Sequence, residues 1–411
     1  MKKLELLNKI KIGKNNSNKI DKKKEDKSKK EKKKKEKIRI KIDKEKIKKI
    51  TSNKIFKILI KICGCILVII ALIILFYALT EYKPKATEKV TVSGEGFYSL
   101  NMGDSFTIMT WNIGYAALGD NADYFRENGK MVQTADRNRI NYNINGIRSK
   151  IDEIRPNVIM MQEIDKNSKR VSHVDEVSSF KNHLSNYSVV FASNYKVTYL
   201  AYPLTDRVGK VHSGIATLSK YTIESAKRVS LPSNYVWPAK MMKEKDCFLI
   251  SYIPIKDSEK KLVLINVQFS KTNKEKNTIK QMEALKEIME KEEKKGNYII
   301  VGGDFKQTFK EIDTSAYPVK EGFWEPRKII KKEIGDNWQT IMDNKVPSSR
   351  SLDKPYEVEK KDSFQYYVID GFIVSNNIEV QEYHTEDYGF EYSYHNPVIM
   401  KINIKKEENK E

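Results

Sequence analysis

The chain has 411 residues, and its 76 lysines and arginines outnumber its 55 aspartates and glutamates, for a formal net charge of +21. Most of this charge is N-terminal, because residues 1–84 hold 27 basic and 9 acidic residues, while residues 85–411 hold 49 and 46, a net of +3. The larger part of the chain is near neutral, so the overall charge does not identify the whole protein as a nucleic-acid binder.

Cysteine usage excludes two further classes of protein. The three cysteines are Cys63, Cys65 and Cys247, and only Cys247 lies in the near-neutral part. That part cannot carry an internal disulfide, and the sequence has no CxxC motif or Cys/His cluster with zinc-ligand spacing. A disulfide scaffold and a structural zinc domain are both ruled out.

Residues 1–60 form a lysine-rich segment with interspersed acidic residues and no aromatic residue before Phe56. Such a composition buries too little apolar surface to offset chain entropy, so we expect a disordered cytoplasmic tail. Two interpretations of its charge stay open. Either the tail is simply solvated and its lysines reflect coding bias, or it adheres to anionic lipid or nucleic acid, at about 1 kcal/mol per lysine beside a membrane.

Ile62 to Leu79 is an uncharged apolar run of 18 residues. As a helix it reaches about 27 Å, close to the ~30 Å hydrocarbon core of a bilayer. The run predicts a single transmembrane helix over residues 61–80. A cleavable signal peptide is the alternative, but about 60 residues precede the run and no small-x-small cleavage site follows it.

Lysine asymmetry predicts the orientation of this helix. Residues 42–61 hold seven lysines and residues 80–99 hold three. The positive-inside rule then puts the N-terminus in the cytoplasm and the C-terminal domain outside the cell membrane. An exported domain without disulfides is ordinary for a bacterial protein. Residues 81–96 are interpreted as a linker.

Residues 97–404 have a globular pattern, and residues 405–411 are expected to be a frayed tail. One predicted helix has an apolar stripe of five isoleucines that ends before Pro156, and a second ends at Gly296. The isoleucines are Ile140, Ile144, Ile147, Ile151 and Ile154.

Four predicted strands end in an amide or a carboxylate. Asn112, Glu163 and Gln268 each lie at the end of an apolar run that predicts a strand, and Asp304 follows the apolar run Tyr298–Val301 and two glycines. Open sheets bind ligands at the ends of their strands, so we expect these four side chains to gather at one sheet edge. An acidic, amide-rich edge suits a hard divalent cation and a phosphate.

Five motifs in order resemble the endonuclease/exonuclease/phosphatase superfamily over about Phe106 to Ile404. They are Trp111-Asn112-Ile113, Gln162-Glu163, Gly303-Asp304-Phe305, Ile369-Asp370-Gly371-Phe372 and Ser393-Tyr394-His395-Asn396-Pro397. The resemblance implies an α+β fold, a four-layer sandwich of two packed mixed β-sheets flanked by helices, here preceded by the single transmembrane helix.

The resemblance also implies an activity, that of a phosphodiesterase or phosphoesterase dependent on Mg²⁺ or Mn²⁺. Glu163 would be the chief metal ligand, with Asn112 beside it. Asp304 would position or deprotonate the attacking water, and His395, oriented by Asp370, would stabilise the phosphate. The leading hypothesis is a membrane-anchored, externally facing hydrolase of a phosphoester in nucleic acid, phospholipid or a small molecule, with no protein partner predicted.

Three positions depart from the family pattern. Gln268 stands where the family has histidine in Asn-x-His, Lys306 where it has the last asparagine of Gly-Asp-x-Asn, and Tyr394 where it has aspartate in Ser-Asp-His. Gln268 and Lys306 can still contact a phosphate, together with Asn112. Lys306 also puts a cation close to the metal position, and Tyr394 removes a negative charge there. The alternative hypothesis is therefore a catalytically impaired protein that binds a phosphate-bearing ligand or a partner.

Overall fold

The computed structural model describes residues 28–270 and 275–406. The chain divides into two compact units, Met1–Phe76 and Tyr77–Glu411, and each is described by itself.

The described part of the N-terminal unit is helical on both sides of Asn53. Residues 28–52 form an exposed helix, so the expected disorder of residues 1–60 is wrong for this part. Lysine and glutamate are good helix formers, and a helix of such residues needs no buried face. The rest of the predicted tail, residues 1–27, lies outside the described residues.

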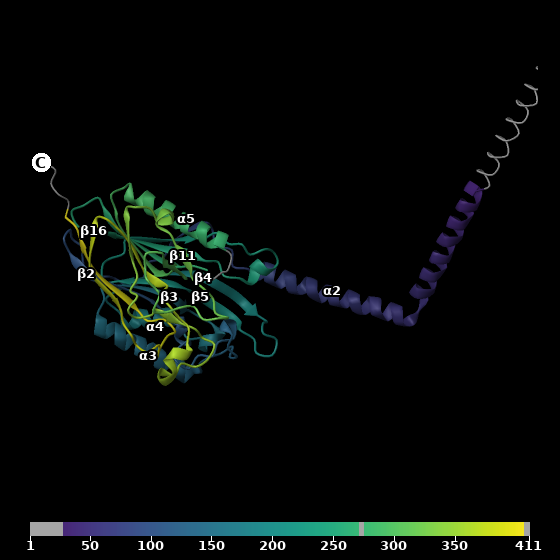
Figure 1. Cartoon of the computed structure of the whole chain (residues 1–411), viewed down its shortest axis with the longest axis horizontal. Helices are drawn as coiled ribbons and strands as arrows, with labels where there is room; N and C mark the ends of the chain where they lie inside the picture. Colours follow the sequence, from purple (N-terminus) through teal and green to yellow (C-terminus); the bar gives the residue numbers. More distant parts are fainter. Residues whose placement is uncertain (1–27, 271–274, 407–411) are drawn as a thin grey trace, which may run out of the picture. The chain divides into compact units, whose positions relative to one another are not determined.

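Helix α2 (Lys54–Thr80) contains the predicted span and begins earlier than expected. The Asn53 side chain accepts a hydrogen bond from the Ile55 backbone N–H at 2.9 Å, which fixes the start of the helix. By length and composition α2 is able to cross a membrane. Figure 1 shows it as one uninterrupted helix.

Two mixed sheets form the C-terminal unit (Figure 1). The first has seven strands, in the order β1 (Thr87–Val90), β6 (Ser225–Ser230), β7 (Cys247–Pro254), β8 (Lys261–Gln268), β9 (Tyr298–Asp304), β15 (Asp370–Ser375) and β12 (Trp338–Ile341). The second has six, in the order β16 (Ile378–Thr385), β17 (Val398–Ile404), β2 (Ser105–Asn112), β3 (Val158–Asp165), β5 (Gly209–Ser219) and β4 (Ser188–Leu200). The pairs β8–β9 and β2–β3 are parallel, and the other neighbours are antiparallel.

Shorter elements complete the unit. The helices are α3 (Arg137–Ile154), α4 (Glu176–His183), α5 (Glu275–Glu293) and α6 (Lys331–Ile334), and the small strand pairs are β10 (Gln307–Phe309) with β11 (Arg327–Ile329) and β13 (Ser349–Arg350) with β14 (Tyr366–Tyr367).

Three apolar cores separate four layers. The central core lies between the sheets and includes Ile108 and Phe372. The predicted isoleucine stripe of α3 packs on the outer face of the six-stranded sheet. Met282 and Leu285 of α5 pack on the outer face of the seven-stranded sheet. The predicted four-layer α+β sandwich is confirmed.

The expected linker, residues 81–96, is partly a strand. β1 pairs with β6 at the edge of the seven-stranded sheet, and the Ser93 backbone N–H donates to the Val189 carbonyl at 2.8 Å. The alternating side chains of Thr87–Val90 suit a half-exposed edge strand, and the sequence analysis missed this pattern because Glu88 and Lys89 lie within it. Of the expected frayed tail, residues 407–411 lie outside the described residues.

The polar strand ends meet at one side of the sandwich. Asn112 pairs with Gln162 across β2 and β3, and Asp304 pairs with both Gln268 and Asp370 across the seven-stranded sheet. The sheets therefore bring residues from distant parts of the chain to a common edge.

Candidate functional site

Glu163 lies in a bulge of β3. The register between β3 and β5 shifts between Met161 and Ile164, and Glu163 has a left-handed φ of 51°. A non-glycine residue in this region is strained by roughly 1–3 kcal/mol, which the surrounding contacts must offset. The bulge turns the carboxylate of Glu163 toward the common edge.

Three neutral donors hold that carboxylate. Glu163 Oε1 accepts hydrogen bonds from Asn112 Nδ2 at 3.1 Å, from Gln268 Nε2 at 2.9 Å and from the Tyr394 hydroxyl at 2.8 Å. Burial acts to raise the pKa of Glu163, but the nearby Lys306 charge and the Asn112 hydrogen bond outweigh it and the pKa is lowered. Glu163 is therefore ionised, and hydrogen bonds from the protein replace the water that would otherwise surround its carboxylate.

Lys306 supplies the positive charge of the site. Its Nζ lies 2.6 Å from Asp304 Oδ2 and 4.0 Å from Glu163 Oε1, and it donates to the Tyr394 hydroxyl at 3.3 Å. Lys306 is buried, and its φ of 47° is left-handed like that of Glu163. Burial acts to lower its pKa, but Asp304 and Glu163 raise the pKa above its usual range. The ammonium is thus held between two carboxylates.

A second, deeper cluster surrounds His395. His395 Nδ1 lies 2.7 Å from Asp370 Oδ2, and the Ser348 hydroxyl donates to the same oxygen at 2.7 Å. His395 Nε2 lies 3.8 Å from Asp304 Oδ2. Burial raises the pKa of Asp370 to about 8, against the opposing effects of the Ser348 hydrogen bond and the Lys306 charge. An imidazole held by a carboxyl group in this way has a fixed orientation and tautomer.

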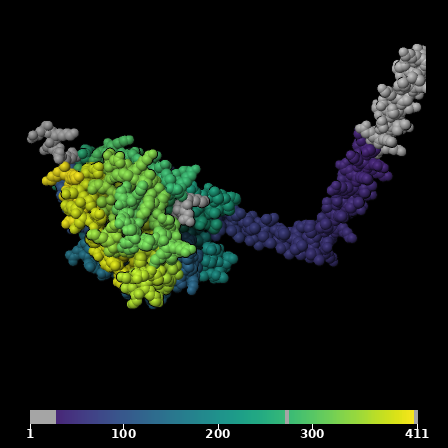
Figure 2. Space-filling view, in the orientation of Figure 1, coloured from purple at the N-terminus to yellow at the C-terminus, as the bar shows by residue number. Residues whose placement is uncertain are grey.

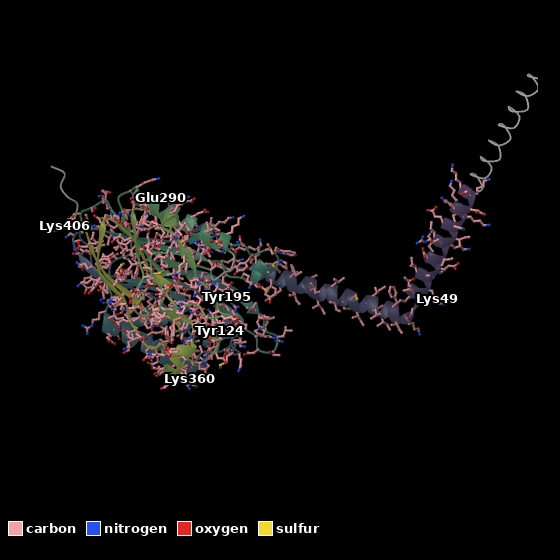
Figure 3. The ribbon with its side chains drawn as sticks, in the orientation of Figure 1. Lys49, Tyr124, Tyr195, Glu290, Lys360 and Lys406 are labelled. Carbon is pink, nitrogen blue, oxygen red and sulfur yellow. The ribbon has the colours of Figure 1, made fainter. Side chains whose placement is uncertain are left out.

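A pocket of about 880 Å³ opens beside the cluster. Glu163, Gln268, Lys306 and Tyr394 line one end of it. Aromatic side chains line much of the remainder: Tyr115, Tyr124, Tyr195, Tyr235, Phe269, Phe323, Trp324 and Tyr367. Figure 3 labels two of them, Tyr124 and Tyr195.

The deeper cluster does not reach this pocket. Asp304, Asp370 and His395 have 0–2% of their surface exposed and are absent from the pocket lining, whereas Lys306 and Tyr394 belong to it. The Tyr394 ring packs edge-on against His395, with ring centroids 4.2 Å apart. Lys306 and Tyr394 therefore stand between the pocket and the acid–imidazole pair.

These residues do not fit a divalent cation between the two carboxylates. The Lys306 ammonium already lies between Glu163 and Asp304, and a second cation there would meet strong repulsion. Within the described residues, Asp304, Asp370 and His395 have ligand atoms within 4.8 Å of one another and form a possible acidic and histidine site. Burial raises the pKa of both carboxyl groups, that of Asp370 to about 8, and this weakens the group as a cation site.

The structure brings all seven predicted site residues together, namely Asn112, Glu163, Gln268, Asp304, Lys306, Asp370 and His395. Their chemical roles stay predictions. The sequence analysis missed Ser348, which holds Asp370, and Asn194, whose side chain donates to Gln268 at 3.0 Å. Both lie outside the predicted strands, and no spacing or motif marks them.

Part of the chain matches a known protein family. Residues 109–305 match the sequence model of the Endonuclease/Exonuclease/phosphatase family. Similar solved structures include an endonuclease/exonuclease/phosphatase from Beutenbergia cavernae, at 14% identity and a TM-score of 0.49, covering 73% of this chain and 72% of that chain. Another from Bacteroides vulgatus has 14% identity, a TM-score of 0.48 and coverage of 74% and 100%. Truncated TDP2 from Caenorhabditis elegans has 13% identity, a TM-score of 0.45 and coverage of 74% and 99%. No curated protein sequence matches the chain.

Proposed function

The chain belongs, through residues 109–305, to the endonuclease/exonuclease/phosphatase family of phosphoester hydrolases, and from this premise we propose that it is a membrane-anchored, externally facing member that binds a phosphate-bearing ligand in the pocket beside Lys306. In this proposal the protein has little or no hydrolytic activity that depends on a divalent metal.

The anchor and the orientation rest on the N-terminal sequence. Helix α2 has the length and apolarity of a membrane span, and lysines are concentrated on its N-terminal side. These features support a single-pass protein of the cell membrane with its large domain outside. The lysine-rich segment that precedes the span is suited to contact anionic lipid on the cytoplasmic side.

One observation carries the functional proposal: Lys306 Nζ lies 2.6 Å from Asp304 and 4.0 Å from Glu163. A single ammonium cancels half the charge of this carboxylate pair and occupies the space between the two groups, so the pair attracts a divalent cation much less strongly. Lys306 also lines the pocket, together with Gln268, and both residue types can contact a phosphate oxygen. The aromatic lining suits the non-phosphate part of such a ligand.

A second candidate is the metal-dependent phosphodiesterase that the sequence predicts. The observation that favours it is the intact His395–Asp370–Ser348 arrangement, since hydrogen bonds of 2.7 Å keep the imidazole oriented for work on a phosphate. This candidate requires that Lys306 and Tyr394 move away from Asp304 when substrate binds.

The test uses the full chain in detergent micelles. Hydrolysis of DNA, RNA and bis(p-nitrophenyl) phosphate is measured with Mg²⁺, with Mn²⁺ and with EDTA, and binding of the same phosphodiester is followed by calorimetry. We expect phosphodiester binding without metal-dependent turnover.

The control is Glu163→Gln, which removes the central carboxylate charge but keeps the shape of the site. Metal-dependent turnover that Glu163→Gln abolishes would establish the second candidate in place of the first. Absence of both turnover and phosphodiester binding would reject both candidates for these ligands.

A further inference from the structure

Two loops of the domain expose large apolar side chains. Residues 201–208 join β4 to β5, and residues 231–246 join β6 to β7. Tyr202 and Leu204 in the first loop are 63% and 78% exposed, and Val236 and Trp237 in the second are 73% and 60% exposed. Single exposed apolar residues are common, but a group of this size calls for a binding partner. Both loops, teal in Figure 1 and in the space-filling view of Figure 2, protrude from the domain.

The two loops belong to one surface. The Phe125 ring contacts the Tyr202 ring of the first loop at a centroid distance of 6.2 Å. The next residue, Arg126, pairs with Glu244 of the second loop at 3.3 Å. We call residues 201–208 and 231–246 together the aromatic rim. The rim borders the pocket described above, because Tyr235 and Lys243 of the second loop are part of the pocket lining.

The rim and its flanking strand contact the residues that directly follow α2. Glu81 follows the last residue of α2, and its Oε1 lies 3.0 Å from Lys245 Nζ in the second loop. The Tyr82 ring lies beneath Lys196, with Nζ 5.8 Å from the ring centroid, on the strand that leads into the first loop. Since consecutive Cα atoms are about 3.8 Å apart, the rim begins within a few residues' reach of the end of α2.

The charge of the rim and its flank differs from that of the rest of the domain. Residues 196–210 hold three basic residues and one acidic residue, and residues 231–246 hold three basic and two acidic residues, so together they carry a net charge of +3. This equals the net charge of all of residues 85–411, so the remainder of that part is neutral overall. Exposed tyrosine and tryptophan beside lysine and arginine are the residues that proteins place at the surface of an anionic bilayer.

We propose that the aromatic rim inserts into the head-group region of the anionic phospholipid bilayer that α2 crosses. The rim and its flanking strand contact Glu81 and Tyr82, which directly follow α2. The large apolar side chains of the rim are exposed, and its net positive charge complements anionic lipid. The inference rests on the membrane anchoring proposed above. Its consequence is that the pocket opens beside lipid head groups.

The experiment uses the full chain reconstituted in vesicles that contain phosphatidylglycerol. Trp237 is the exposed one among four tryptophans, since Trp111 and Trp338 are buried and Trp324 is half-buried in the pocket wall. The difference in emission between the wild type and Trp237→Phe therefore reports on Trp237. We expect this difference emission to shift to shorter wavelength, and lipids brominated near the head-group end of the acyl chain to quench it at least twofold more than aqueous iodide does.

Two variants serve as controls. In the Trp237→Phe background, Val358→Trp puts a tryptophan at a 63% exposed position near Lys360, which Figure 3 labels, and we expect iodide but not bromine to quench it. The double variant Arg207→Glu, Lys240→Glu reverses charge on the rim without touching Trp237, and we expect bromine quenching of Trp237 to fall at least twofold.

Three outcomes overturn the inference. Iodide quenching of Trp237 without bromine quenching means that the rim stays in water. A blue shift with neither kind of quenching means that a second protein copy covers the rim. Failure of the chain to float with the vesicles removes the anchor itself, and flotation thus separates failure of the proposed anchoring from failure of the rim.

Discussion

The Glu163 side and the His395 side of the candidate site lie on adjoining strand ends but balance charge in different ways. On the Glu163 side, an ammonium and three neutral donors hold two carboxylates. On the His395 side, Asp370 meets an imidazole and a hydroxyl group and is deeply buried. The difference teaches that the residues suited to act on a phosphate persist, while the place of a cation is filled by the protein itself. Lys306 is the residue that occupies the cation position, so its substitution is expected to change the site most.

The largest effect is expected from Lys306→Met. The substitution leaves the buried Asp304 carboxylate without its cation, which typically costs about 3–5 kcal/mol of folding free energy. Chemical unfolding of the full chain in detergent measures this loss. Lys310→Met, at an exposed lysine directly after β10, should change stability by less than about 0.5 kcal/mol. Equal effects of the two substitutions would contradict the central role of Lys306.

The double variant Lys306→Asn, Tyr394→Asp should restore a cation site on the Glu163 side. It removes a positive charge within about 4 Å of Glu163 and Asp304 and adds a negative charge beside Glu163, and each such charge is worth up to ~4 kcal/mol at an effective dielectric constant of 20. We expect Mn²⁺ affinity to rise at least about 100-fold, measured by calorimetry. The same variant with Glu163→Gln added is the control and should lose most of the gain. Unchanged Mn²⁺ affinity would mean that Lys306 does not exclude the metal.

The His395 side should give the protein a pH dependence. The pKa of Asp370 is about 8 in the folded protein and about 3.9 in an unfolded chain. Between these two pKa values the folded state keeps the proton on Asp370 and the unfolded chain does not. The resulting contribution to the free energy of unfolding is complete below pH ~4 and is lost as the pH rises toward 8, at up to ~1.4 kcal/mol per pH unit. Asp370→Asn should flatten this slope in unfolding measurements between pH 5 and 8. Asp362→Asn, at an exposed position, is the control and should leave the pH slope unchanged. An unaltered slope in Asp370→Asn would mean that a group other than Asp370 binds the proton.

The smallest effect is expected from Gln268→Ala. It removes one of the three hydrogen bonds to Glu163 and frees the amide of Asn194, at a cost of about 1 kcal/mol. Water reaches this part of the pocket and limits the loss. Thermal unfolding measures it, with the exposed Gln381→Ala as the neutral control. A loss as large as that of Lys306→Met would place the main support of Glu163 on Gln268.

The sequence predicts the fold and the identity of the site residues better than their arrangement. Apolar runs that end in polar residues follow from strand geometry alone, so the meeting of Asn112, Gln268 and Asp304 was predictable. The φ of 51° at Glu163 was not, because a bulge depends on the register between two strands that are distant in sequence. The same holds for Ser348, whose bond to Asp370 exists only in the folded chain. The burial of the lysine ammonium beside Tyr394 depends on side-chain packing that no motif records.

The early start of the sheet has a consequence for where the protein can act. Only six residues, 81–86, separate the end of α2 from β1, so even a fully extended connection reaches about 20 Å. Several of these six residues are already tied to the domain surface, which shortens the connection further. A domain held this closely has no stalk on which to sample distant material. In the proposed membrane-anchored orientation, ligands that stay far from the lipid surface lie beyond its reach.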